Sequence, residues 1–200
     1  MIKIEFLKSP HSFSANCYLI SSNGEYAVID PSAPFDKSLC DGVVKYILLT
    51  HAHFDHILEV DSWVNNTNAK VIISADEVDA LSDPIRNCFK LYDGTERGYF
   101  GPAEPIYDGD KLSLGDCEIK FISTPGHTVG GGVYLCENIA FVGDTIFEGG
   151  GYGRHDLPTS SYVMLRNSIA RLLELPDETV VYSGHGPSTT IKQYKHDIGR

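Results

Sequence analysis

The run His51-Ala52-His53-Phe54-Asp55-His56 places three imidazoles and one carboxylate within six positions. It directly follows residues 43–49, a nearly continuous apolar run that predicts a buried strand. Side chains two positions apart in an extended segment point the same way, so we expect His51 and His53 to face one point. Asp55 and His56 then turn toward a neighbouring point, so one short turn can serve two adjacent metal ions.

Imidazole nitrogen and carboxylate oxygen are ligands for zinc, iron and manganese, and zinc is the commonest with this mixture. Three further motifs each place one ligand-type residue where a predicted strand ends. They are Thr124-Pro125-Gly126-His127-Thr128, Val142-Gly143-Asp144-Thr145 and Ser183-Gly184-His185-Gly186-Pro187. Each motif alone also fits a turn with a polar residue, but together with the first run they predict a metal site along one edge of a sheet.

Composition narrows the class of partner. The formal net charge of −11 argues against nucleic acid, which usually requires a basic face. The N-terminal residues lack a long apolar segment of the secretory type, and no apolar stretch approaches the roughly 20 residues of a membrane helix. Five widely spaced cysteines without a CxxC pair fit a reduced, cytoplasmic protein. We therefore expect a small-molecule substrate, no nucleic acid and no membrane.

The 200 residues predict a single domain over 1–200, or a compact pair of similar halves. Alternating or continuous apolar runs predict strands and helices in a repeated order, with the loop 94–105 as the seam between halves. The predicted strands are 2–7, 17–21, 26–29, 43–49, 71–73, 111–114, 118–122, 132–135, 139–142 and 180–182. The predicted helices are 57–64, 75–91 with a break near Pro84, 162–175 capped by Ser160 or Ser161, and 190–197. This order fits an α+β sandwich of two packed sheets with helices outside.

The four motifs resemble those of the metallo-β-lactamase-fold hydrolase superfamily, and within it the glyoxalase II-like branch. The resemblance extends from Ala27-Val28-Ile29-Asp30-Pro31 to Gly184-His185-Gly186. It implies a four-layer αββα sandwich with the site at the open edge of two sheets. It also implies a first metal held by His51, His53 and His127, a second held by Asp55, His56 and His185, and Asp144 bridging both.

The function implied by this resemblance is hydrolysis of a small thioester, such as a glutathione thioester, by a hydroxide shared between two metals. Asp55 would orient the nucleophile in addition to binding metal. The glycine-rich loop 148–156 would supply the substrate contacts, with Arg154 meeting a carboxylate and Tyr152 forming pocket wall. His155 has no partner motif and is expected at the surface. The branch's bridging aspartate argues against a true lactamase, and His53 argues against the diiron oxidoreductases, which usually carry glutamate there.

Other functions of the same fold stay open. A mononuclear-iron persulfide dioxygenase is suggested by Gly153-Arg154-His155-Asp156, although Leu157-Pro158 departs from its pattern. A lactone or ester hydrolase and a non-enzymatic metal-binding module are further alternatives. Two departures concern the leading function: we expect no C-terminal helical domain of the kind that helps bind glutathione, and Ile57-Leu58-Glu59 replaces glycines that often follow the metal motif.

Overall fold

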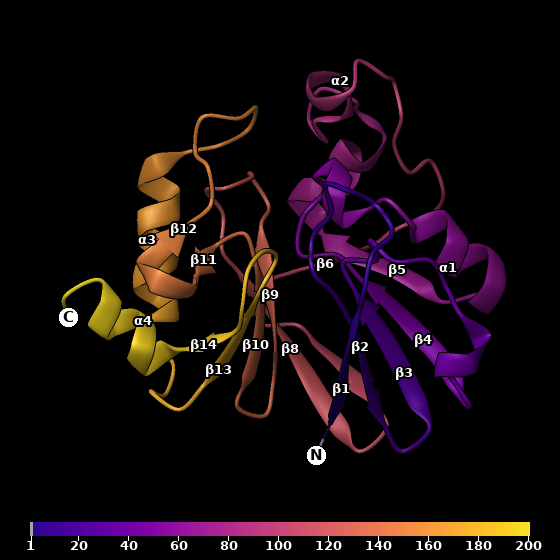
Figure 1. The fold of residues 1–200 in the computed structure, drawn as a ribbon, viewed down its shortest axis with the longest axis horizontal. Helices are drawn as coiled ribbons and strands as arrows, with labels where there is room; N and C mark the ends of the chain where they lie inside the picture. Colours follow the sequence, from indigo (N-terminus) through magenta and orange to yellow (C-terminus); the bar gives the residue numbers. More distant parts are fainter. Residues whose placement is uncertain (1) are drawn as a thin grey trace.

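The computed structural model describes residues 2–200 and arranges them in two six-stranded sheets packed face to face, with helices outside (Figure 1). In spatial order, the first sheet contains β1 (Lys3–Leu7), β2 (Cys17–Ser22), β3 (Glu25–Ile29), β4 (Val43–Leu48), β5 (Lys70–Ser74) and β6 (Glu104–Ile106). The second contains β7 (Lys111–Leu114), β8 (Cys117–Ser123), β9 (Gly132–Cys136), β10 (Ile139–Gly143), β13 (Val180–Ser183) and β14 (Thr189–Thr190). This is the predicted αββα sandwich.

Short elements cover and connect the sheets. The α-helices are α1 (Val60–Thr67), α2 (Phe89–Tyr92), α3 (Tyr162–Leu172) and α4 (Ile191–Asp197). The 3-10 helices are η1 (Lys37–Leu39), η2 (Phe54–His56), η3 (Ala75–Ser82) and η4 (Glu148–Gly150), and β11 (Ile146–Phe147) pairs with β12 (Gly151–Tyr152). In Figure 1, α1 lies outside the first sheet, while α3 and α4 lie outside the second. No helix within residues 2–200 is both long and apolar enough to cross a membrane.

Three hydrophobic cores separate the four layers. Ile47 and Leu49 pack toward α1, whereas Leu48 between them packs into the core that separates the sheets. Both faces of β4 are therefore buried, which explains why its sequence is a continuous apolar run instead of an alternating one. A third core lies under the outer helices, where Leu172 and Tyr194 pack against the second sheet.

The two sheets are also joined by a buried phenol. The Tyr134 hydroxyl, on β9, lies 3.1 Å from the carbonyl oxygens of Leu49 and Ile72 in the first sheet. Burial raises the pKa of Tyr134 well above its usual value, so this group stays a neutral hydroxyl that can donate. The contact with Leu49 lies two residues before His51. It therefore fixes the sheet edge from which the segment 51–56 emerges.

Two predictions about local structure were wrong, and some short elements were missed. Residues 75–91 are not one broken helix: a 3-10 helix ends at Ser82, and only a single α-turn follows. The Asp83 carboxylate accepts from the backbone N–H of Ile85 and Arg86, an Asx turn that replaces helical bonding. The loop 94–105 is not the seam, because β6 still pairs with β5 and the chain crosses between sheets only after it. The β11–β12 hairpin and β14 were not predicted.

The topology brings several strand ends to one edge. β10 runs parallel to β13, and β8 runs in the same direction because both it and β10 are antiparallel to β9. Residues that follow β8, β10 and β13 therefore meet at one edge of the second sheet. β4 ends beside them, since the backbone N–H of Gly132 donates to the Thr50 carbonyl at 2.9 Å.

Candidate metal centre

His51, His53 and His127 form a compact group of ring nitrogens. The Nδ1 atom of His53 lies 3.1 Å from Nε2 of His51 and 2.9 Å from Nε2 of His127. His51 lies three residues after the end of β4, His53 precedes η2, and His127 comes from the loop after β8, so the two sheets contribute to the same point. All three residues are buried. This is the trio that the sequence predicted for a first metal.

A second group lies beside the first. The Nε2 atom of His185 is 3.0 Å from Oδ2 of Asp55, and Nε2 of His56 is 3.8 Å from the same oxygen. Potential ligand atoms of Asp55, His56 and His185 all lie within 4.8 Å of one another. His56 is fully buried, whereas His185 is partly exposed. This second trio is therefore open to solvent on the His185 side.

Asp144 lies between the two groups. Its Oδ1 is 3.4 Å from Nε2 of His56, and its Oδ2 is 3.5 Å from Nε2 of His127 and 3.6 Å from Nε2 of His185. Oδ1 thus faces a member of the second trio, and Oδ2 faces one member of each trio. The structure brings together all seven residues that the sequence predicted as ligands.

A buried carboxylate behind the site orients two of the histidines. Asp30 accepts from Nδ1 of His56 at 2.8 Å and from the backbone N–H and hydroxyl of Thr50 at 2.8 and 2.7 Å. Because the Thr50 hydroxyl donates to Asp30, it is left to accept from Nδ1 of His51, 3.2 Å away. Both rings are then held with Nε2 toward the centre and with a free lone pair there.

The third oriented histidine is His127. Its Nδ1 lies 2.8 Å from the backbone carbonyl oxygen of Arg154, which can only accept, so Nδ1 carries the proton and Nε2 presents its lone pair. Arg154 thus has a role that the sequence did not predict, through its main chain.

The electrostatics favour the neutral form of two histidines in the first trio. Burial, followed by the neighbouring His56, holds the pKa of His51 well below its usual range. Burial and then His127 lower the pKa of His53 from 6.5 to about 3. Burial acts in the opposite direction on the Asp144 carboxyl, but the neighbouring His56, His127 and His185 outweigh it and lower its pKa. Neutral imidazoles beside an ionised carboxylate are what a divalent cation requires.

The donor set passes a test of fit for a metal. Nε2 of His56 and Oδ1 of Asp144 are buried and make no hydrogen bond in the part of the chain described here, residues 2–200. Buried polar atoms without partners are costly, and these two face each other across 3.4 Å. A cation between the trios would satisfy both atoms. Burial lowers the pKa of His56, but the Asp30 and Asp55 carboxylates outweigh burial and raise this pKa well above its usual value, which marks the position as one that attracts positive charge.

Close approach of two strand ends makes the cluster possible. A Cβ atom on Gly184 would lie 2.2 Å from Oδ1 of Asp144 and 2.7 Å from Cε1 of His56. Only glycine therefore fits directly before His185, and any larger residue would separate the ends of β10 and β13.

The site opens into a cavity of about 470 Å³. One side consists of His53, Asp55, His127, Asp144 and His185. The opposite walls are mainly apolar and are formed by Phe54, Leu91, Tyr92, Phe147, Tyr152 and Leu157. The Phe54 and Tyr92 rings stack at 4.2 Å, which gives this wall a defined flat face.

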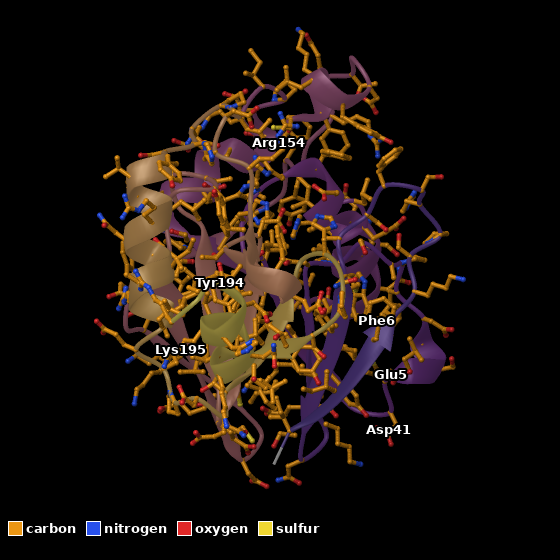
Figure 2. The ribbon with its side chains drawn as sticks, turned by 60° about the vertical axis from the view of Figure 1, so that its left-hand side comes forward. Glu5, Phe6, Asp41, Arg154, Tyr194 and Lys195 are labelled. Carbon is orange, nitrogen blue, oxygen red and sulfur yellow. The ribbon has the colours of Figure 1, made fainter. Side chains whose placement is uncertain are left out.

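The predicted substrate residues lie at the rim of this cavity. Tyr152 and Arg154 line it, and Figure 2 shows Arg154 toward the upper end of the molecule, away from Tyr194 of α4. The Arg154 guanidinium pairs with both oxygens of Asp156, at 2.9 and 3.0 Å, and is largely exposed. The ring of His155 packs against Tyr162, with centroids 4.7 Å apart.

Comparison with known proteins assigns the family. The family model described as the metallo-beta-lactamase superfamily matches residues 12–185. This chain belongs to the metallo-β-lactamase superfamily. The chain is 34% identical to the "Probable metallo-hydrolase YqgX" of Bacillus subtilis, over 88% of this chain and 87% of the relative. It is 30% identical to "Hydroxyacylglutathione hydrolase GloC" of Haemophilus influenzae, over 92% of this chain and 91% of the relative.

Solved structures of superfamily members match the fold. The BLEG-1 B3 metallo-beta-lactamase superposes with a TM-score of 0.87 at 30% identity, covering 97% of both chains. TTHA1623 in a di-iron-bound form gives 0.83 at 28% identity, over 96% of this chain and 97% of the other. ETHE1 from Myxococcus xanthus gives 0.78 at 26% identity, over 99% and 84%. The predicted superfamily and sandwich fold are confirmed, and membership together with the His/Asp cluster supports a metal-dependent hydrolase.

Proposed function

We propose that this superfamily member is a binuclear hydrolase of a small thioester, with a glutathione thioester as the leading substrate class. The observation that carries the proposal is Asp144, whose two oxygens face His56 on one side and His127 and His185 on the other. A carboxylate in this position suits a bridge between two cations. The 30% identity to a protein named hydroxyacylglutathione hydrolase supports the substrate class.

The residues would divide into two sets. His51, His53 and His127 would hold one divalent ion; Asp55, His56 and His185 would hold the other; and Asp144 would touch both. Zinc is the metal we favour for this donor set, with iron and manganese as alternatives. Divalent ions bound here would supply a water of lowered pKa and polarise the acyl carbonyl.

The chain's own residues would hold and orient the substrate. Asp55 lines the cavity and can accept a hydrogen bond from a water molecule there, which suits the orienting role expected for it. The stacked Phe54 and Tyr92 would contact the apolar part of the thioester, and Arg154 at the rim would meet its carboxylate. A thiolate leaves with little need for protonation at neutral pH, so the reaction requires no general acid from this wall.

Elemental analysis of the purified protein, followed by turnover of a substrate panel, tests the proposal. We expect two divalent ions per chain and hydrolysis of glutathione thioesters ahead of simple esters, lactones and a β-lactam. The β-lactam belongs in the panel because of the match to BLEG-1. One metal per chain, or a lactone or β-lactam preferred over every thioester, would overturn it.

A persulfide dioxygenase with a single iron is the second candidate. The likeness to ETHE1 fits it, and the di-iron-bound form of TTHA1623 favours testing iron. Oxygen consumption on glutathione persulfide by the iron-loaded protein, without thioester hydrolysis, would favour this candidate. The cytoplasmic location and the absence of nucleic-acid or membrane partners remain predictions from composition.

A further inference from the structure

Glu77 is a buried carboxylate that joins the two loops of the metal centre from behind. It lies on η3 and is 1% exposed. Its Oε2 accepts from the backbone N–H of Ala52 at 3.0 Å, and its Oε1 accepts from the backbone N–H of Gly130 at 2.9 Å. These partners are 25 positions before and 53 positions after it in the chain. One side chain therefore connects an edge of the first sheet with an edge of the second.

Ala52 and Gly130, the two partners of Glu77, lie close in sequence to the predicted ligands of the first metal. Ala52 stands between His51 and His53, so fixing its N–H fixes the backbone that aims both rings. Gly130 lies three residues after His127, in the short segment that leads into β9. The distance between the His51/His53 pair and His127 therefore depends on a carboxylate that touches none of the three rings.

The chemistry of the contact requires a carboxylate. Two buried N–H donors need two acceptor oxygens, and an ionised glutamate supplies both. A glutamine at position 77 would present one oxygen and one NH2 group, so one backbone N–H would meet a donor. Hydrogen bonds to a charged acceptor are also stronger than neutral ones.

Gly130 is matched to Glu77 in space. A Cβ atom at position 130 would lie 2.8 Å from Cγ of Glu77 and 2.9 Å from Cβ of Asp76. The loop of His127 can therefore approach the carboxylate only because residue 130 has no side chain.

We propose that Glu77 is a positioning residue, which sets the separation between the His51/His53 pair and His127 and thereby the affinity of that trio for metal. The inference rests on the metal centre of the proposed function, but not on its thioester substrate. Outer-shell groups of metal sites typically change affinity by about 10- to 100-fold, and we expect an effect in this range.

Metal release from the zinc-loaded full chain to a chromogenic chelator tests the proposal. We expect Glu77→Gln to release zinc about 10- to 100-fold faster than the wild type. A matched control is Trp63→Phe, which removes a buried 2.8 Å hydrogen bond to the Ala33 carbonyl but leaves both loops intact. Amide exchange of the metal-free proteins gives a second readout, in which the N–H groups of Ala52 and Gly130 should exchange faster in Glu77→Gln only.

The outcomes separate the possible explanations. Release at the wild-type rate, or equal acceleration in Trp63→Phe, would overturn the positioning role. If Glu77→Gln does not fold, Gly130→Ala keeps the carboxylate but displaces the loop, and faster release from it is the expected result. A wild-type chain that takes up no metal would overturn the metal centre and the role of Glu77 together, whereas a metal-binding chain without thioesterase activity would overturn only the proposed substrate.

Discussion

The Nδ1 atom of His56 lies 2.8 Å from Oδ2 of Asp30, a residue 26 positions earlier in the chain. Asp30 directly follows β3 and has a positive φ of 49°, which turns its carboxylate back under the segment 51–56. It also receives both donors of Thr50. This one buried side chain therefore determines which nitrogen of His56 faces the centre.

Replacement of Asp30 should weaken metal binding without removing a ligand. In Asp30→Asn, the side-chain oxygen can still accept a hydrogen bond but the NH2 group cannot, so Thr50 and His56 cannot both keep their acceptors. We expect a loss of metal affinity of about 10- to 100-fold. Competition with a calibrated chelator measures it. An affinity equal to that of the wild type would show that the ring of His56 is held by its packing alone.

Asp144→Ala should reduce the metal content from two ions to at most one. Because a shared ligand is removed, hydrolysis should fall by more than about 100-fold, beyond the range typical of outer-shell groups. Metal analysis and steady-state kinetics check both effects. Asp177→Ala is the control, since that exposed carboxylate pairs with Lys195 on α4, outside the second sheet. Two retained metals with unchanged turnover would contradict the bridging assignment.

Arg154→Ala should affect substrate binding more than chemistry. The carbonyl that receives Nδ1 of His127 is retained in the variant, so the centre is preserved. For a thioester with a free carboxylate we expect KM to rise about 10-fold, equivalent to about 1.4 kcal/mol, with kcat nearly constant. An uncharged thioester should show no change. If both substrates respond equally, the guanidinium does not contact the carboxylate.

Chelation should lower thermal stability. Metal that binds only the folded chain stabilises it by about 2.7 kcal/mol at a free concentration of 100 Kd. For a chain of this size we expect a decrease in Tm of roughly 5 to 11 °C after removal of the metal. Calorimetry with and without chelator measures the shift, and added zinc should restore it. A Tm that does not change when chelator is added would argue against occupied metal sites.

Asp108 should contribute a measurable pH dependence to stability. Its hydrogen bonds from Arg171, at 2.8 and 3.0 Å, lower the pKa of the carboxyl below 3.8. A folded pKa below the unfolded value gives stability that is present above about pH 4 and is lost as the pH falls through the folded pKa. The pair is exposed, so we expect about 0.2 to 1 kcal/mol. In urea unfolding, Asp108→Asn should be less stable than the wild type near pH 6. The difference in free energy of unfolding should become smaller toward pH 3.

The fold and the predicted ligand residues were accessible to sequence reasoning because local patterns carry them. The apolar residues 47–49 alternate between two cores, and a strand buried on both faces leaves that continuous signature. His51, His53, Asp55 and His56 are close in sequence, and the other three candidates each follow a strand. Ser161 was one of two predicted caps of α3, and its hydroxyl does accept from the Met164 N–H.

The roles of Asp30 and Glu77 depend on partners that are distant in sequence, and they left little local signal. Asp30 looked like the end of a strand, although a buried acid after an apolar run was a usable hint. Glu77 lies in a polar stretch that resembles an exposed helix, and only the approach of Ala52 and Gly130 reveals its contacts. The helix expected over 75–91 failed for a related reason, since the Leu81 carbonyl bonds to the N–H of Tyr99 instead of continuing a helix.

The order of the predicted ligands along the chain also sets the order in which the two trios can assemble. The first trio cannot close until residue 127 has left the ribosome, and the second must wait for residue 185. At about 5 to 20 residues per second, the two events are separated by roughly 3 to 12 s during synthesis. If each trio binds an ion, a nascent chain would pass through a stage in which only the first trio can be complete, and the metal that is most available at that moment would have the first opportunity to bind.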